Sequence, residues 1–178
     1  MKRFVLYLWL LVALSSLTFC QKTDDDLKKK VVYKGPIAET RDLLTLYSDS
    51  AKLKIKLTSP LQLQYESGDG VYPKGLDLVF FDEKGNVNNT LRANYGKYLR
   101  QKDMYIIRGN VILHNPNKSE TLRTEELQWD RQTRKIFTDK FVTIQTKDDI
   151  LKGYGMTSNQ DFSNPIILKP TGIISLQQ

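Results

Sequence analysis

The sequence predicts an all-β, antiparallel fold, and three observations support this prediction. Apolar and polar side chains alternate over fourteen residues from Lys52 to Tyr65, a period of two that suits a strand and not a helix. Polar turns separate this run from other short apolar runs. Blocks of sequence also align at a 31-residue offset, as expected when one two-strand unit is stacked several times. From Val31 onward, the one weak helical turn is at Ala93–Leu99.

The N-terminal segment has the pattern of an export signal. Lys2 and Arg3 precede an uncharged run of sixteen residues, Phe4–Phe19. A helix of that length is about 24 Å long, short against a hydrocarbon core of about 30 Å, so a signal peptide is favoured. A short apolar anchor helix, with Lys2, Arg3 and Lys22 snorkelling, is the alternative. Residues 1–20 are therefore interpreted as a signal or membrane-anchor segment.

Cys20 closes this segment and is the single cysteine of the sequence, so no intramolecular disulfide can form. Leu17 stands three residues before it, as in the lipobox of bacterial lipoproteins, although Phe19 occupies a position where a small residue is usual. Three interpretations stay open: lipidation at Cys20, an uncleaved anchor, or ordinary cleavage further upstream. Either of the first two leaves the domain tethered to a membrane.

Residues 21–32 read as a polar, aperiodic tether, and residues 33–178 as a single β-domain. Three adjacent carboxylates on the tether, Asp24 to Asp26, lack the glycine turn and the distal Glu of a calcium loop. No metal ion or other cofactor is expected.

The formal net charge is +7, and removing Lys2 and Arg3 leaves about +5. This excess suits an anionic partner, either a phosphorylated lipid or a nucleic acid. Because the chain is expected to be exported, nucleic acid is disfavoured.

The clearest strand, Lys52–Tyr65, has one apolar face and one polar face. Pro60 falls on the polar face and removes one ladder donor, which predicts a bend or an edge position. The residues expected to share the apolar face are Leu53, Ile55, Leu57, Leu61, Leu63 and Tyr65.

Three further strands are expected at Gly75–Phe81, Met104–His114 and Lys135–Thr146. The polar segment Asp82–Asn86 follows the first of them as a hairpin turn. Short strands joined by polar turns are typical of an antiparallel meander.

The 31-residue offset aligns residues 91–113, 122–144 and 153–175 without gaps. Such a two-strand unit buries its apolar face only against its neighbours, which predicts a sandwich or an open, groove-like roll. The two ends of the stack are then exposed strand edges, available to partners. The residues that coincide at the end of each unit are Val111, Val142 and Ile173.

An enzyme is not expected. His114, the one histidine, precedes a turn that contains proline, where a surface role is commoner than a general base. Glu125 and Glu126 fall on opposite faces of a strand and cannot act together on one bond.

A series of segments follows in a specific order and spacing between residue 33 and about residue 174: Tyr33–Pro36, Tyr47–Leu53, Tyr72–Leu76, Leu91–Tyr95, Arg108–Val111, Thr121–Asp130, Ile136–Asp139 and Lys152–Gly155. Together they resemble the LptC family of lipopolysaccharide-export proteins.

The resemblance implies an antiparallel β-jellyroll, a twisted, boat-shaped open groove of the OstA/LptA-like kind, as a periplasmic domain anchored to the inner membrane. It implies that lipopolysaccharide is received from an LptBFG-type ABC transporter at the N-terminal edge. The lipid then passes to an LptA-like bridge protein at the C-terminal edge strand, without a cofactor or a chemical reaction. The apolar segment ends at Cys20, which suggests a lipid anchor in place of the membrane-spanning helix usual in the family. Whether this chain makes that helix's contacts with the transporter is therefore left open.

Ten apolar residues are candidates to line the lipid groove, with plain core as the alternative for each: Leu61, Leu63, Leu78, Phe80, Ile107, Val111, Phe137, Val142, Ile144 and Ile173. Arg92, Arg108 and Arg123 are candidates to meet lipid phosphates, with a solvated face as the alternative. A second hypothesis is an envelope lipoprotein that binds glycan or protein on a β-sandwich. It requires an exposed aromatic platform, for which Tyr95, Tyr98 and Trp129 are the candidates.

Overall fold

The computed structural model describes residues 33–172 and confirms the all-β, antiparallel prediction. Eleven strands form one sheet, and the helical element among the described residues is a single 3-10 turn, η1 (Arg100–Lys102). The expected N-terminal apolar helix, Cys20 and Ile173 lie outside the described residues. The strands are β1 (Ala38–Asp49), β2 (Lys52–Gln64), β3 (Gly70–Tyr72), β4 (Leu76–Phe81), β5 (Val87–Ala93), β6 (Tyr95–Leu99), β7 (Met104–Asn115), β8 (Glu120–Asp130), β9 (Lys135–Gln145), β10 (Ile150–Asn159) and β11 (Ile166–Thr171).

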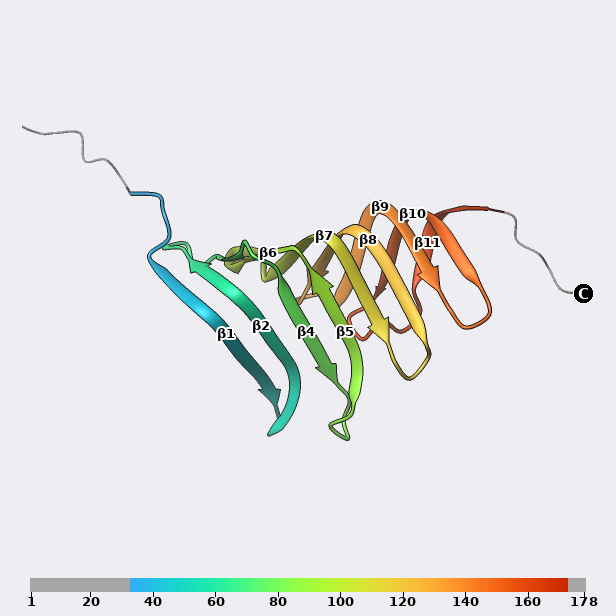
Figure 1. Ribbon diagram of the computed structural model, residues 1–178, viewed down its shortest axis with the longest axis horizontal. Helices are drawn as coiled ribbons and strands as arrows, with labels where there is room; N and C mark the ends of the chain where they lie inside the picture. Colours follow the sequence, from blue (N-terminus) through green and yellow to red (C-terminus); the bar gives the residue numbers. More distant parts are fainter. Residues whose placement is uncertain (1–32, 173–178) are drawn as a thin grey trace, which may run out of the picture. The chain divides into compact units, whose positions relative to one another are not determined.

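The strand pairing folds this one sheet into two layers. The N-terminal half of β2 pairs with β4 and its C-terminal end with β3. In the same way, β7 pairs with β6 through residues 104–108 and with β5 through residues 112–114. We call the layer that contains β4 and β5 layer A, and the layer that contains β3 and β6 layer B. The long strands β8 to β10, and the shorter β11, continue both layers, and Figure 1 shows the strands turning over along the edge where the layers meet.

This edge, the corner, is made by residues with left-handed backbone. Asp42 in β1 (φ 50°), Asn110 in β7 (φ 47°) and Gly155 in β10 (φ 73°) all lie there, and the register of β7 against β8 and of β10 against β9 shifts beside them. A bulge of this kind bends a strand and increases its twist. Pro60 lies where β2 changes partner from β4 to β3, so the predicted bend is present.

The inward-facing positions do not keep a strict period of two through the corner. On β8 the buried residues Thr124 and Leu127 are three positions apart, whereas on β7 Ile107 and Val111 are four apart. An odd step changes which of the alternating residues face inward. The alternation of apolar and polar residues in one half of a strand therefore does not predict which residues face inward in the other half.

The apolar face expected along Lys52–Tyr65 is wrong beyond Pro60 for this reason. Leu63 pairs with Val71, and the neighbour of Val71, Tyr72, is buried in the core. Leu63 and Leu61 therefore lie on the outer face of layer B, and neither belongs to the buried cluster. The weak helical turn expected at Ala93–Leu99 is also wrong, because Tyr95–Leu99 forms β6 between β3 and β7.

The core lies between the layers and contains side chains from both of them. Val111 and Val142, which the 31-residue offset brings together, fall in one register row through Thr124 of β8. The buried apolar residues are Leu57, Tyr72, Leu76, Leu78, Phe80, Leu91, Ala93, Ile107, Val111, Leu113, Leu122, Leu127, Trp129, Ile136, Val142, Ile144, Met156 and Phe162.

The sheet has two edges among the described residues, β1 and β11, each paired on one side. Both expose large apolar side chains, Leu44 and Leu46 on β1 and Ile166 and Leu168 on β11. Unpaired edges of this kind are available to add another strand.

Candidate functional site

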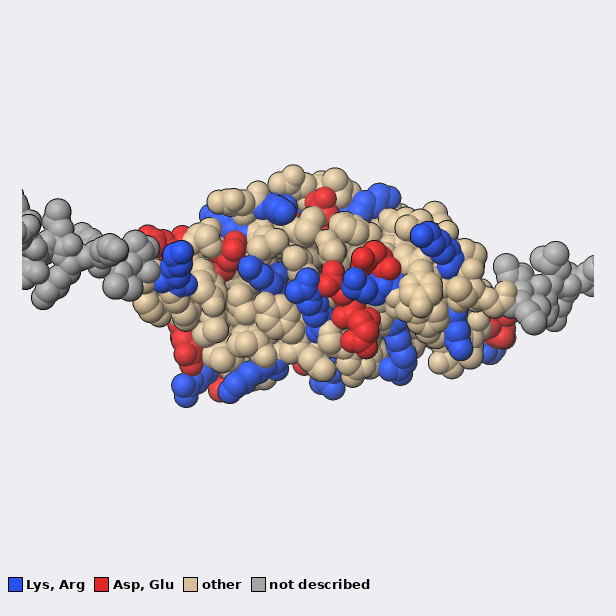
Figure 2. Space-filling model, turned by 90° about the horizontal axis from the view of Figure 1, so that it is seen from above, with Lys and Arg blue, Asp and Glu red and all other residues tan. Residues whose placement is uncertain are grey.

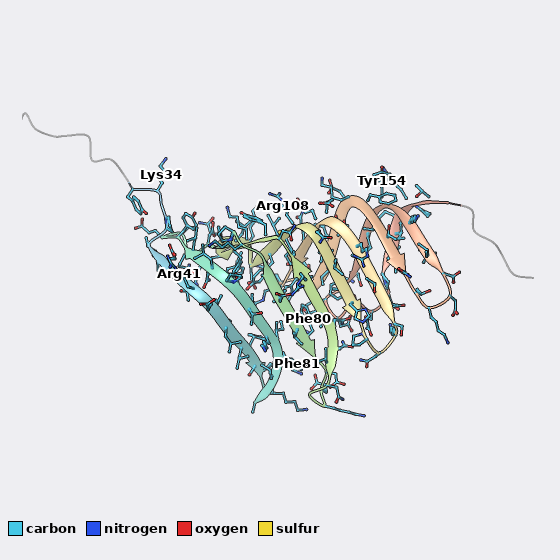
Figure 3. All side chains as sticks on the ribbon, in the orientation of Figure 1. Lys34, Arg41, Phe80, Phe81, Arg108 and Tyr154 are labelled. Atoms are coloured by element: carbon cyan, nitrogen blue, oxygen red, sulfur yellow. The ribbon has the colours of Figure 1, made fainter. Side chains whose placement is uncertain are left out.

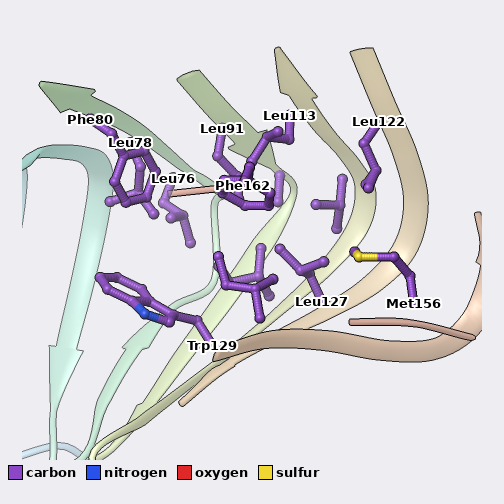
Figure 4. Packing of buried hydrophobic residues seen from close by; sticks show 14 of the residues in the cluster. Leu76, Leu78, Phe80, Leu91, Leu113, Leu122, Leu127, Trp129, Met156 and Phe162 are labelled. Atoms are coloured by element: carbon purple, nitrogen blue, oxygen red, sulfur yellow. The ribbon is translucent and has the colours of Figure 1, made fainter. Parts of the chain in front are cut away.

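The space between layers A and B is an apolar interior. Among the described residues, the strands of the two layers pair along the corner and not along the opposite side, which we call the open side. Figure 4 shows the side chains from both layers pointing into the interior. Each fully buried aliphatic side chain contributes about 1.5–3 kcal/mol of hydrophobic stabilisation. Those at 2% exposure or less are Leu76, Leu78, Leu91, Ile107, Val111, Leu127, Ile136, Val142 and Met156.

A row of aromatic rings crosses this interior from one layer to the other. The rings of Tyr98 and Tyr105 have centroids 4.7 Å apart, and Tyr105 stacks on Trp129 at 5.3 Å and 19°. Trp129 then meets Phe80 edge-on at 5.8 Å and 68°. Since Phe80 belongs to layer A and the other three rings to layer B, the row holds the two layers together at this point.

The tyrosine hydroxyls of this row remain protonated at physiological pH. Burial strongly raises the pKa of Tyr105 and also raises that of Tyr72. Burial, and a 2.9 Å hydrogen bond that the hydroxyl donates to Asp103 Oδ1, raise the pKa of Tyr98. The same Asp103 oxygen accepts a hydrogen bond from Arg131 at 3.1 Å. The aromatic row is thus neutral, with its charged groups at its outer end.

Two neighbouring pockets lie where the interior approaches β1. The smaller, about 110 Å³, is lined by Thr45, Tyr47, Leu57, Leu78 and Trp129, among others. The larger, about 430 Å³, shares Tyr47 and Trp129 with it. The smaller pocket is lined mostly by apolar side chains, whereas the larger is lined mostly by polar and charged ones. An apolar space therefore lies beside a polar one, which suits an amphiphilic ligand.

Charged groups of both signs line the larger pocket. Lys54 forms an ion pair with Glu83, and the guanidinium of Arg131 lies 5.5 Å from the centroid of the Tyr47 ring. Arg134 and Asp161 complete the charged part of the wall. Figure 2 shows the same interspersion of basic and acidic side chains on the face seen from above. The larger pocket is therefore polar over most of its wall, and its apolar part includes Phe80 and Trp129.

Catalytic groups do not gather in residues 33–172. His114 is exposed, and its Nδ1 lies 3.1 Å from Thr121 Oγ1. Glu126 forms a 2.6 Å ion pair with Arg108 on the outer face. Within these residues no three His, Cys, Asp or Glu side chains come close enough to hold a metal ion.

Six of the ten predicted groove residues lie in the buried interior: Leu78, Phe80, Ile107, Val111, Val142 and Ile144. Leu61 and Leu63 lie on the outer face, as described above. Phe137 does so too, because its strand neighbours Ile136 and Thr138 are the buried ones.

The three arginines singled out from the sequence lie on exposed outer positions. Arg92 donates a 2.7 Å hydrogen bond to Asp77, and Arg108 is paired with Glu126. Arg123 is exposed on β8. Figure 3 shows Arg108 on the ridge formed by the corner, away from the interior. None of the three borders either pocket at the β1 end.

The aromatic platform required by the second hypothesis is not formed by its three candidates. Trp129 is 5% exposed and lies within the aromatic row, and the ring of Tyr98 packs against Tyr105 at an interplanar angle of 35°. No observation therefore favours a glycan- or protein-binding platform made by Tyr95, Tyr98 and Trp129.

Several interior residues were missed by sequence reasoning. Leu127 and Trp129 did carry a signal, because each alternates with polar neighbours on its strand, whereas Tyr105 lies between Met104 and Ile106. Phe162 carried none, since it lies in the loop between β10 and β11. Its burial depends on residues distant in the sequence.

The sequence of residues 4–164 matches the family described as lipopolysaccharide-assembly, LptC-related. The chain belongs to this family. LptC-related proteins take part in lipopolysaccharide transport as non-enzymatic, envelope-associated components. In this LptC-related chain the match runs from the apolar N-terminal segment through β10 into the loop that follows. A comparison with curated proteins finds no match.

Among residues 33–172 of this LptC-related protein, no helix is long and apolar enough to cross a membrane.

Proposed function

We propose that this protein receives lipopolysaccharide from an LptBFG-type inner-membrane ABC transporter and passes it to an LptA-like periplasmic protein, with the acyl chains held between layers A and B. The observation that carries this proposal is the apolar interior lined by both layers, with unfilled pockets at its β1 end. The protein performs no chemical step. It supplies a surface along which the lipid moves.

Burial of acyl chains provides the binding free energy. Each buried methylene contributes about 0.8 kcal/mol, so ten methylenes contribute about 8 kcal/mol. The polar rim around Lys54, Arg131 and Arg134 leaves room for a phosphorylated headgroup beside the apolar space. We therefore propose that an arriving acyl chain first occupies the pockets beside Tyr47, at the β1 end.

The two sheet edges suit partners on either side. We propose that β1 faces the transporter and that β11 faces the LptA-like protein. Edge-to-edge pairing uses backbone hydrogen bonds, which need no particular side chains. The exposed Leu44 and Leu46 on β1, and Ile166 and Leu168 on β11, add apolar area at each contact. Pairing at both edges would make the interior of this protein continuous with that of its neighbours.

We further propose that residues 33–178 form a periplasmic domain held at the inner membrane through residues 1–20, with lipidation at Cys20 as the favoured anchor. An uncleaved apolar helix is the alternative. Residues 21–32 then serve as the tether between the anchor and β1.

Photocrosslinking tests the lipid path with a matched pair of positions on one strand. Tyr47 lines both pockets, whereas Leu46 points from the opposite face of β1 and is 57% exposed. Each is replaced with p-benzoyl-phenylalanine in the full chain, and energised cells are irradiated. We expect lipopolysaccharide adducts at position 47 and not at 46. Adducts at neither position, or equal adducts at both, would contradict a path between the layers.

A further inference from the structure

The loop between β10 and β11, residues 160–165, crosses the open side of the interior. It begins at the layer B end of β10, where the backbone N–H of Gln160 donates to the carbonyl oxygen of Arg134 at 2.9 Å. On the far side, Asn89 of β5 in layer A donates from Nδ2 to the carbonyl oxygen of Asp161 at 3.0 Å. The loop is therefore attached to both layers, and we name it the strap.

The strap keeps its shape through bonds within itself and to the end of β10. Ser163 takes part in most of these hydrogen bonds. Its carbonyl oxygen accepts from Ser158 Oγ at 3.0 Å, and its hydroxyl accepts from Asn159 Nδ2 at 3.0 Å. Its hydroxyl also donates to Asp161 Oδ1 at 2.6 Å. In the part of the chain that the structure describes, the Asn89 bond is the one hydrogen bond from the strap to layer A. Breaking that bond leaves the internal ones in place.

Phe162 is the second attachment to layer A. Its backbone is left-handed (φ 57°), a conformation that costs a bulky residue about 1–3 kcal/mol. The side chain is 5% exposed, and its ring lies edge-on to Phe80 at 6.4 Å. Figure 4 shows the ring among Phe80, Leu91 and Leu113 of layer A. Burial of the ring offsets the backbone strain, since a buried Phe contributes about 1.5–3 kcal/mol.

We infer that the strap is a lid on the groove and that the Phe162 ring occupies a site for a lipid acyl chain. This inference rests on the proposed function. The space that the ring fills is walled by aliphatic and aromatic side chains, and a short run of methylenes fills similar space without a polar partner. When the strap swings away from layer A, the ring leaves the site and the open side of the interior is uncovered. An acyl chain then replaces the ring.

The energetics permit such an exchange. Opening the strap breaks one hydrogen bond to layer A and removes one ring from the core, while the bonds within the strap remain. An arriving acyl chain restores the lost apolar burial. The two states therefore lie close enough in free energy for lipid to shift the population between them.

The inference is tested by locking the strap to layer A. Asn88 and Asp161 line the same pocket, so the double variant N88C/D161C is joined with a short bis-methanethiosulfonate reagent, whose disulfides dithiothreitol cleaves. The reporter is p-benzoyl-phenylalanine at position 80, where the adjoining pocket of about 430 Å³ leaves room for the added ring. The single variant N88C, treated in the same way, is the matched control and also retains Cys20.

Without the lock, lipopolysaccharide adducts are expected at position 80. With the lock they should fall to the background of an unirradiated sample, and dithiothreitol should restore them. Locked protein that forms as many adducts as the control would overturn the inference and leave the proposed function intact. Absence of adducts in the unlocked protein at both positions 47 and 80 would overturn the proposed function and the lid with it.

Discussion

The indole of Trp129 meets the ring of Phe80 edge-on, with centroids 5.8 Å apart, although the two residues belong to opposite layers of the sheet. The strands that carry them, β8 and β4, are not neighbours in the sheet, so this contact is made across the interior. Edge-to-face geometry is the favourable arrangement for such a pair. The aromatic row therefore fixes how far apart the layers stand beside the pockets.

Replacing Trp129 with alanine should destabilise the protein by about 3–5 kcal/mol, since a buried indole is removed and its neighbours cannot fill the space. Guanidinium unfolding of the domain measures the loss. Tyr154→Ala is the control, because Tyr154 is 54% exposed and, among the described residues, its one aromatic ring contact is with Phe141. The Tyr154→Ala substitution should lower the free energy of unfolding by about 1 kcal/mol or less. Equal losses for the two variants would show that the row does not hold the layers together.

Gly75→Ala should destabilise the protein more than Gly85→Ala. Both glycines are left-handed, with φ +88° and +85°, so both substitutions cost about 1–2 kcal/mol in backbone strain. A Cβ at position 75 would also lie 2.7 Å from the carbonyl oxygen of Ala93, whereas one at position 85 meets nothing within 4 Å. Thermal unfolding of the two variants should give the lower midpoint for Gly75→Ala, and the reverse order would contradict the close approach at this turn.

The hairpin turn between β4 and β5 should lose stability in acid. Hydrogen bonds from the backbone N–H and side chain of Asn86, and from the Lys84 backbone, lower the pKa of Asp82 below its ordinary 3.8. A lowered pKa means that the carboxylate stabilises the fold above its ordinary value and that this contribution disappears as the pH falls through the lowered pKa.

Comparing the wild-type protein with Asp82→Asn tests this pH dependence. The variant should be less stable at about pH 7, and the difference should shrink as the pH falls through the lowered pKa of Asp82. A difference in unfolding free energy that stays constant as the pH falls through this range would mean that the Asp82 charge does not support the turn.

Lipidation at Cys20 predicts a specific mass for the membrane-extracted protein. Loss of residues 1–19 together with an added diacylglyceryl group is expected for the wild type, and a Cys20→Ser variant should lack both changes. Intact-mass spectrometry distinguishes these outcomes. A full-length, unmodified mass for the wild type would instead indicate the uncleaved anchor.

The sequence by itself determined the fold class and the positions of four of the eleven described strands, β2, β4, β7 and β9. Alternation along β2, and the polar turn that starts at Asp82, are local features, because neighbouring residues in a strand must face opposite sides and a tight turn needs particular residues. Leu78 and Val142, which the sequence offered as groove lining or plain core, lie in the interior for the same reason.

Only the tertiary structure decided which face a strand presents beyond the corner. Left-handed residues such as Asn110 bend the strands, and the step across the bend is three residues on some strands and four on others. Leu63 therefore faces outward, although Leu57 on the same strand is buried. The strap is the extreme case: Asn89 and Asp161 are 72 positions apart, and a loop shows no period that would bring Phe162 into the interior. Such contacts depend on the arrangement of the two layers, because no local pattern records which distant residues will enclose a side chain.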